Sequence, residues 1–228
     1  MPRFTCRAIR WCCAISGIAT GSSALAGSLG FNDAQEIRFD LLVGAARRIL
    51  AVSDLPLTVD FEAGYADDVD GVARNARSLA DLGVVGCNSE DQVIGSQGLV
   101  DTMHQTQRIA AVADSGLFVN ARTDIFLERL RAGENANDPA LLPAALERAT
   151  AYADAGARCF FVPGLSDSTL IAVLSEKSPL PVNVMRLPVM ASNAALAELG
   201  AARISYGPGP WTAAMETFRT VAAAAYTA

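Results

Sequence analysis

Residues 57–65 read LTVDFEAGY, a run of strand-forming residues that carries two carboxylates and then breaks at a glycine. Because side chains alternate along a strand, we expect Asp60 and Glu62 to point to the same face. Two unpaired carboxylates are costly to bury, but their oxygens are good ligands for a hard divalent cation. The stretch by itself leaves two interpretations open: a metal site at the end of a buried strand, or solvated acids that cap the strand.

The rest of the chain alternates between short apolar runs and segments in which apolar residues recur at helical spacing. The short runs are almost continuously apolar, as expected for parallel strands that are covered on both faces. No long linker or change in composition divides the chain. We predict strands at 14–20, 57–62, 84–90, 117–124, 158–163, 181–185 and 202–206, and helices at 36–51, 68–82, 102–114, 139–155, 166–176, 192–199 and 211–225.

Polar residues recur at the carboxyl ends of several predicted strands. Chemistry contributed by many strand ends at one rim is typical of a (β/α)₈ barrel. An open doubly wound sheet instead concentrates it at one switch point, usually beside a glycine-rich phosphate turn, and the sequence has no such turn. An α/β barrel with one strand missing is therefore favoured, and the strand-end residues are Thr20, Ser22, Asp60, Glu62, Asn88, Glu90, Asn120, Arg122, Asp124, Asn183 and Ser205.

The composition is that of one globular domain, with 228 residues of which 51% are hydrophobic and 18% are charged. The formal net charge of −6 argues against nucleic acid as a partner. No apolar run reaches the roughly 18 residues that a membrane span needs, so we expect no membrane partner. The five cysteines are odd in number and lack paired metal-ligand spacing, which indicates reduced thiols and a cytoplasmic protein.

The first residues allow two interpretations. Arg3, Arg7 and Arg10 precede an apolar run, and the Ala24-Leu25-Ala26 triplet follows it, which is the layout of a secretory signal peptide. Against export, a serine and a glycine interrupt the apolar run, and its end also reads as a barrel strand. We prefer the second interpretation and divide the chain into an atypical N-terminal segment, 1–13, and a single β/α barrel domain, 14–228.

Six segments together carry a family resemblance. They are VDFEAGYADD at 59–68, GVVGCNSED at 83–91, FVNARTDIFL at 118–127, FFVPGL at 160–165, PVNVM at 181–185 and ARISYGPGP at 202–210. In order and spacing they resemble the isocitrate lyase/phosphoenolpyruvate mutase superfamily from about residue 14 to the C-terminus. The segment ATGSSALAGSLGFND at 19–33 then resembles the second barrel strand and its loop. The resemblance implies a (β/α)₈ TIM barrel in which the first βα unit is lacking here.

The resemblance also implies a Mg²⁺-dependent enzyme, with Mn²⁺ as the other candidate ion, that acts on a small carboxylate substrate. By its motifs, Asp60, Glu62 and Glu90 would hold the metal. Mg²⁺ prefers oxygen ligands and would polarise the oxygen of a 2-oxo acid that becomes an enolate. Arg122 would contact substrate, although a structural ion pair with Asp124 or Glu90 is the alternative. The remaining assignments are Tyr65 as a second catalytic residue, and Ser22, Ser23, Ala24, Asp33 and Asn183 as substrate-binding residues.

One segment departs from the family pattern. In the lyase subgroups a Lys-x-Cys-Gly-His segment follows the residue that Glu90 matches, whereas residues 91–96 here read DQVIGS. The general acid/base is therefore unassigned, and Cys87 lies inside a strand, where we expect a core residue.

We therefore predict a lyase-type enzyme that works through a pyruvate-like enolate, with carbon–carbon bond cleavage as the first candidate reaction. Phosphonopyruvate mutase-like and oxaloacetate decarboxylase-like activities are the enzymatic alternatives. A truncated, non-catalytic family member that binds a partner is the alternative from another class. A homo-oligomer, either a dimer or a tetramer, is the expected assembly.

Overall fold

The computed structural model describes residues 17–227 of the chain. Within them, seven parallel strands form one sheet whose spatial order follows the chain: β1 (Ile18–Ala19), β2 (Leu57–Asp60), β3 (Gly86–Glu90), β4 (Phe118–Arg122), β5 (Cys159–Val162), β6 (Val182–Met185) and β7 (Ala201–Ser205). A strand order that follows the chain is that of a β/α barrel, whereas a doubly wound sheet reverses its order at a switch point. The barrel prediction is confirmed, and the doubly wound alternative is wrong.

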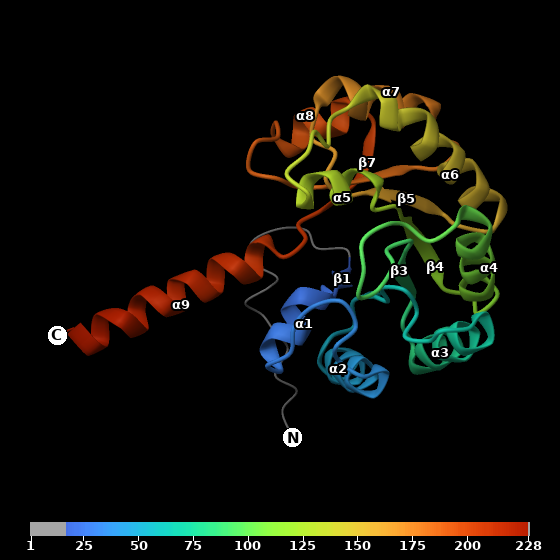
Figure 1. Cartoon of the computed structure of the whole chain (residues 1–228). Helices are drawn as coiled ribbons and strands as arrows, with labels where there is room; N and C mark the ends of the chain where they lie inside the picture. Colours follow the sequence, from blue (N-terminus) through green and yellow to red (C-terminus); the bar gives the residue numbers. More distant parts are fainter. Residues whose placement is uncertain (1–16, 228) are drawn as a thin grey trace.

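Helices follow the strands, and most of them cover the outer side of the curved sheet. They are α1 (Ser22–Ser28), α2 (Phe39–Val52), α3 (Val69–Leu82), α4 (Thr102–Ala113), α5 (Ile125–Arg131), the 3₁₀ helix η2 (Pro139–Leu141), α6 (Leu142–Asp154), α7 (Ser168–Lys177), α8 (Asn193–Glu198) and α9 (Gly209–Thr227). In Figure 1, α2, α3, α4, α6 and α7 follow one another around the sheet, while α9 extends away from the body of the molecule.

Alternate residues along each strand point to opposite sides of the sheet. One side packs against the helices, and the other faces the concave inside of the barrel. Val59, Cys87 and Val119 are in register on β2, β3 and β4, and all three are buried in the hydrophobic core beneath the helices. Cys87 is therefore the core residue that its sequence position predicted. Toward their carboxyl ends the alternate residues on these strands are polar, namely Asp60, Asn88, Glu90, Asn120 and Arg122, and they face the concave interior, where parallel barrels place their sites.

Several boundaries differ from the predicted ones for local reasons. The predicted strand 57–62 ends at Asp60, because Glu62 takes a left-handed backbone with φ 48°. Residues 22–28, expected as a turn and loop, form the helix α1 behind the N-cap Gly21. The seven-residue helix α5 was also not predicted, since it is too short to establish a helical period. The predicted segment 1–13 and residues 14–16 of the first predicted strand lie outside the described residues.

The sheet is open along one line within residues 17–227. β1 and β7 are its two edges, so the described part of the chain supplies seven of the eight strands of a β/α barrel. Among the helices of residues 17–227, none has the length and apolar character needed to cross a bilayer.

Candidate active site

Asp60 closes β2 and joins it to the β1–α1 turn. Its Oδ2 accepts a hydrogen bond from the backbone N–H of Ser22 at 3.1 Å, and its own backbone N–H donates to Oγ1 of Thr20 at 3.0 Å. Asn88, the register partner of Asp60 on β3, approaches Oδ1 at 3.4 Å. The turn that was expected to hold substrate therefore lies beside the expected metal ligand, and the Ser22 N–H bonds Asp60.

Glu62 lies past the end of the strand, in a turn that glycine makes possible. Gly64 has φ 96°, and a Cβ there would come within 2.7 Å of Cγ2 of Val72. In this turn the carboxylate of Glu62 accepts two hydrogen bonds, from the Tyr65 hydroxyl at 2.6 Å and from the backbone N–H of Gln35 at 2.9 Å. The sequence predicted that strand alternation would point Glu62 to the same face as Asp60. Because Glu62 lies beyond the end of β2, strand alternation does not set its orientation.

The pKa of Glu62 is raised to about 7. Burial is the largest cause, and the bonds from Tyr65 and Gln35 oppose it by stabilising the ionised form. The negative charges of Asp60 and Asp33 raise this pKa further. The pKa of Tyr65 is raised as well, by burial first and then by the charge of Glu62.

Glu90 and Arg122 end the next two strands in register. Nη1 of Arg122 lies 2.5 Å from Oε2 of Glu90, although that buried oxygen has no hydrogen bond of good geometry. The guanidinium also binds Asp124 bidentately, at 2.5 and 2.7 Å. Burial raises the pKa of Glu90 well above its usual range, and the charge of Arg122 opposes that shift. The ion pair that the sequence left open for Arg122 thus forms with both acids.

A buried network, centred on Asp91, supports this pair from behind. Asp91 is fully buried, and its carboxylate accepts bonds from the Asp124 backbone N–H at 2.8 Å, the Tyr152 hydroxyl at 2.7 Å and Nη1 of Arg148 at 2.9 Å. The network joins the ends of β3 and β4 to α6. Sequence reasoning missed it, although an acid beside Glu90 and an Arg-x-x-x-Tyr pair on one helix face were visible in the sequence.

A cavity of about 730 Å³ opens over these strand ends. Six of the predicted site residues line it: Ser22, Ser23, Ala24, Asp33, Asp60 and Arg122. Glu90 reaches the cavity through its ion pair with Arg122. Asn183 is buried and bonds Ser205, which does line the cavity. Phe161, Met185, Arg203, Ser205 and Trp211 belong to the opposite wall.

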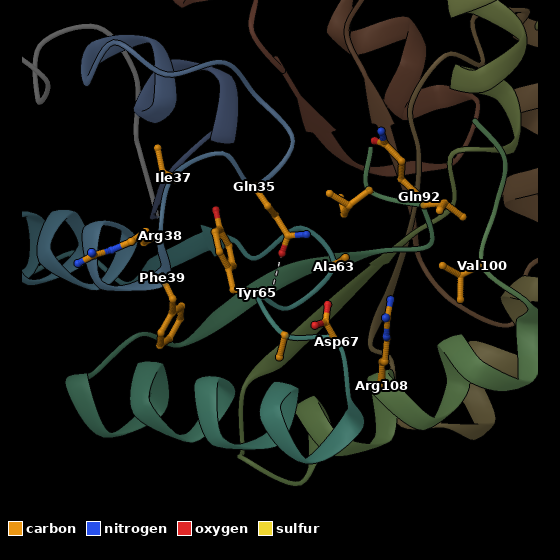
Figure 2. A pocket seen from close by; sticks show the side chains of 13 residues that line it. Gln35, Ile37, Arg38, Phe39, Ala63, Tyr65, Asp67, Gln92, Val100 and Arg108 are labelled. Carbon is orange, nitrogen blue, oxygen red and sulfur yellow. Dashed lines mark hydrogen bonds between the residues drawn. The ribbon is translucent and has the colours of Figure 1, made fainter. Parts of the chain in front are cut away.

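Tyr65 lies on a second cavity rather than on the first. This cavity, of about 670 Å³, lies among the loops that follow α1, β2 and β3. Figure 2 shows Tyr65 beside Gln35, whose side-chain oxygen accepts the backbone N–H of Tyr65 at 2.7 Å. Because Gln35 and Tyr65 both also bond Glu62, their loops fix the position of that carboxylate from this side.

The acidic residues meet the chemical requirements of a Mg²⁺ site in part. Among residues 17–227, no group of three or more His, Cys, Asp or Glu side chains is gathered closely enough to hold an ion. Mg²⁺ needs only one or two carboxylates, however, because it keeps several waters and takes oxygens from its substrate. Asp60 and Glu90 are buried oxygen donors, and Oε2 of Glu90 lacks a hydrogen bond, so the donor chemistry fits the ion.

Comparisons with known proteins identify the family and the fold. The family profile of phosphoenolpyruvate phosphomutase matches residues 5–226. The 2-methylisocitrate lyase of Salmonella typhimurium is 32% identical over 174 residues, which cover 72% of this chain and 55% of that protein. The chain thus spans about half the length of the curated relatives that it matches.

Solved structures share the fold. A Burkholderia cenocepacia protein with a provisional phosphonomutase assignment superposes with a TM-score of 0.87 at 39% identity, covering 93% of this chain and 85% of that one. A phosphonopyruvate hydrolase, solved in complex with oxalate and Mg²⁺, superposes with a TM-score of 0.77 at 21% identity, covering 92% and 74% of the two chains. The latter likeness concerns the fold.

Proposed function

The chain belongs to the phosphoenolpyruvate phosphomutase family, within the isocitrate lyase/phosphoenolpyruvate mutase superfamily, and we propose that it is a Mg²⁺-dependent lyase-type enzyme acting on a small 2-oxo or 2-hydroxy carboxylate. One observation carries the proposal: Asp60, Glu62 and Glu90 are buried acids at or just beyond the carboxyl ends of β2 and β3, at the rim where barrels place their chemistry. Acids buried together at such cost are typical of a functional site.

In this proposal Asp60, Glu62 and Glu90 would hold the ion, directly or through bound water. When bound, Mg²⁺ supplies Lewis-acid stabilisation of an enolate oxygen. The related phosphonopyruvate hydrolase, which binds Mg²⁺ with oxalate, supports both the ion and the type of ligand. Mn²⁺ has similar oxygen-ligand chemistry and is the substitute that we expect to support activity.

The chain's own side chains bind and orient the substrate. Arg122 lines the cavity and, held flat by its bidentate bond to Asp124, presents its guanidinium in one fixed plane. The first turn of α1, Ser22 to Ala24, and the acid Asp33 line the cavity beside Asp60. Tyr65 acts on the site through Glu62, whose ionised form its hydroxyl stabilises. Asn183 fixes Ser205 at the far wall.

The experiment is a substrate screen with pyruvate release as readout. Oxaloacetate, 2-methylisocitrate, other 2-hydroxy diacids and phosphonopyruvate are each tested with Mg²⁺, with Mn²⁺ and with EDTA. We expect turnover of at least one compound, which EDTA abolishes and added Mg²⁺ restores. Turnover that EDTA leaves unchanged would contradict the assignment of the acids as metal ligands.

A second candidate function is that of a non-catalytic family member. The observation that favours it is that Glu62 and Glu90 already have partners, in Tyr65, Gln35 and Arg122. Calorimetric titration with Mg²⁺ in the presence and absence of oxalate separates the two candidates. An enzyme of the proposed class binds the ion more tightly with oxalate present, whereas a non-catalytic protein has no such coupling.

We also propose a homo-oligomer that forms through α9. The helix extends away from the body in Figure 1, and its side chains Phe218 and Val221 are 68% and 66% exposed. Exposed apolar side chains along one helix are typical of an interface. Light scattering after size exclusion is the test: Phe218→Glu is expected to reduce the oligomer to monomers, and an unchanged mass would contradict the proposal.

A further inference from the structure

Arg203 is an arginine of the cavity wall that has no acidic partner among residues 17–227. One row of residues in register crosses four neighbouring strands of the sheet. It runs from Arg122 on β4 through Phe161 on β5 and Asn183 on β6 to Arg203 on β7. Three strand spacings of about 4.8 Å separate the two arginines along the sheet, or roughly 14 Å. The two side chains therefore approach the same cavity from opposite walls.

The arginines that line this cavity differ in their partners. Arg122 is bound by Glu90 and Asp124, and Arg131 lies within 3.5 Å of both Asp124 and Glu128. Arg203, in contrast, makes no side-chain hydrogen bond or ion pair with any of residues 17–227. It is therefore the cavity cation whose charge no acid of the described chain neutralises.

The acids of the cavity do not serve as that partner. Asp33 and Asp60 line the same cavity, and neither forms an ion pair or a hydrogen bond with Arg203. Arg203 is in register with Asn183 and lines the cavity, so its side chain is on the interior side of the sheet, where it is half-buried.

We propose that Arg203 binds a second carboxylate of the substrate, at the wall opposite the acids. An unpaired, half-buried cation is unfavourable by itself, and a ligand that brings one negative charge removes that penalty. One unpaired arginine matches one carboxylate, which it can bind bidentately. The substrate is then a dicarboxylic acid: its 2-oxo or 2-hydroxy end lies at Asp60, and its second carboxylate lies at Arg203.

This inference rests on the proposed function for the location of the first carboxylate. It makes Arg203 a residue that selects the substrate, because a ligand without the second carboxylate would leave the guanidinium unpaired. Arg203 was not among the residues that the sequence singled out, since a lone arginine in a strand has no motif.

A matched pair of ligands tests the proposal. Malate and 2-hydroxybutyrate share the 2-hydroxy acid end, and they differ in that malate has a second carboxylate where 2-hydroxybutyrate has a methyl group. With Mg²⁺ present, dissociation constants are measured by calorimetry for the full chain and for Arg203→Met and Arg203→Lys. We expect the full chain to prefer malate at least tenfold, Arg203→Met to lose that preference, and Arg203→Lys to keep part of it.

Two controls separate a specific contact from a general loss of charge or fold. Arg158→Met removes one positive charge from the exposed residue that precedes β5, at the other end of the strands, and should keep the malate preference. The unfolding temperature of each variant shows whether it is folded. A malate preference that survives in Arg203→Met, or that falls equally in Arg158→Met, would overturn the proposal, as would a full chain that does not bind malate.

Oxalate distinguishes this failure from failure of the proposed function. Its two carboxylates are adjacent, so it occupies the acidic end of the site without reaching Arg203, and its binding should be equal in the full chain and in Arg203→Met. If oxalate binding shows no Mg²⁺ dependence while the malate preference still depends on Arg203, the proposed function fails and the Arg203 subsite stands.

Discussion

The two walls of the cavity differ in whether their charged side chains have partners within the protein. On the wall formed by β2, β3 and β4, each buried carboxylate has a fixed partner: Ser22 for Asp60, Tyr65 for Glu62 and Arg122 for Glu90. On the wall formed by β5, β6 and β7, the neighbours are Phe161 and Met185, and a single charged residue, Arg203, has no partner among residues 17–227. The carboxylates of the first wall are held by protein groups, whereas the guanidinium of Arg203 on the second wall is available to a ligand.

The difference teaches where the fold stores unfavourable free energy. Burial raises the pKa of Glu62, Glu90 and Asp91, so ionising these acids works against the metal-free fold. A divalent cation would offset the cost of burying these negative charges at the first wall. A bound carboxylate would likewise offset the cost of burying the charge of Arg203 at the second. The comparison of malate with 2-hydroxybutyrate tests the second wall, and the predictions below test the first, beginning with the largest expected effect.

Replacing Asp60 should remove function while the fold survives. Asp60→Ala is expected to lower Mg²⁺-dependent turnover by a factor of about a thousand or more, because metal stabilisation of a developing negative charge is worth several kcal/mol. Steady-state kinetics on whichever compound the screen identifies is the measurement. Asp54→Ala, an exposed acid before β2, is the matched control and should keep full activity. Equal activity in the two variants would remove Asp60 from the site.

Asp91 supports the first wall, so its loss should affect stability as well as rate. Asp91→Asn is expected to lower the free energy of unfolding by about 3 kcal/mol, since it leaves the partly buried Arg148 without its counter-charge. Urea unfolding measures this change. Asp40→Asn breaks the exposed pair with Arg38 and should change stability little. If both variants lose the same stability, the Asp91 network has no special role.

The stability of the metal-free chain should fall as the pH rises. The folded pKa of Glu62 is about 7, above its ordinary value of 4.5, so the folded state binds more protons between these values. The stabilisation is therefore complete below about pH 4.5 and is lost as the pH rises through 7. Scanning fluorimetry should show this decline, a shallower decline in Glu62→Gln, and a larger stabilisation by Mg²⁺ at pH 8 than at pH 5.5. A stability independent of pH in this range would count against the buried acids.

Tyr65 should have the smallest effect, because it acts through Glu62. Its hydrogen bond lowers the pKa of Glu62, so Tyr65→Phe should raise that pKa above 7 and weaken Mg²⁺ binding a few-fold at neutral pH. At high pH, where Glu62 is ionised in both proteins, the difference should disappear. Calorimetric titration at pH 7 and at pH 9 measures both results, and an equal loss at the two pH values would indicate a direct role for Tyr65 instead.

Sequence patterns could predict the first wall better than the second. Apolar runs that end in Asp60, Glu90 and Arg122 place these residues at neighbouring strand ends, because parallel strands bring their carboxyl ends together. The turn at Glu62 could not be predicted, since no local pattern indicates its left-handed backbone, and the close packing of Gly64 beneath Val72 on α3 exists only in the folded chain.

The other missed features depend on partners that are distant in sequence. Asp91 meets Arg148 and Tyr152 only when α6 packs behind β3, and these partners are 57 and 61 residues away. Arg203 stands out only because no described acid reaches it, which no local pattern could indicate. The segment around Ser22 was identified as part of the site, but its helical conformation was not, because a seven-residue helix has too few turns to show a period.

The central claim is that Asp60 and its neighbouring acids form a Mg²⁺ site for a small oxo or hydroxy acid. Calorimetric titration of Mg²⁺ into the full chain and into Asp60→Ala, each with and without oxalate, tests it most directly. The account predicts Mg²⁺ binding that oxalate strengthens in the full chain, and loss of both the binding and the coupling in Asp60→Ala. Equal Mg²⁺ affinity in the two proteins, with no effect of oxalate, would contradict the claim.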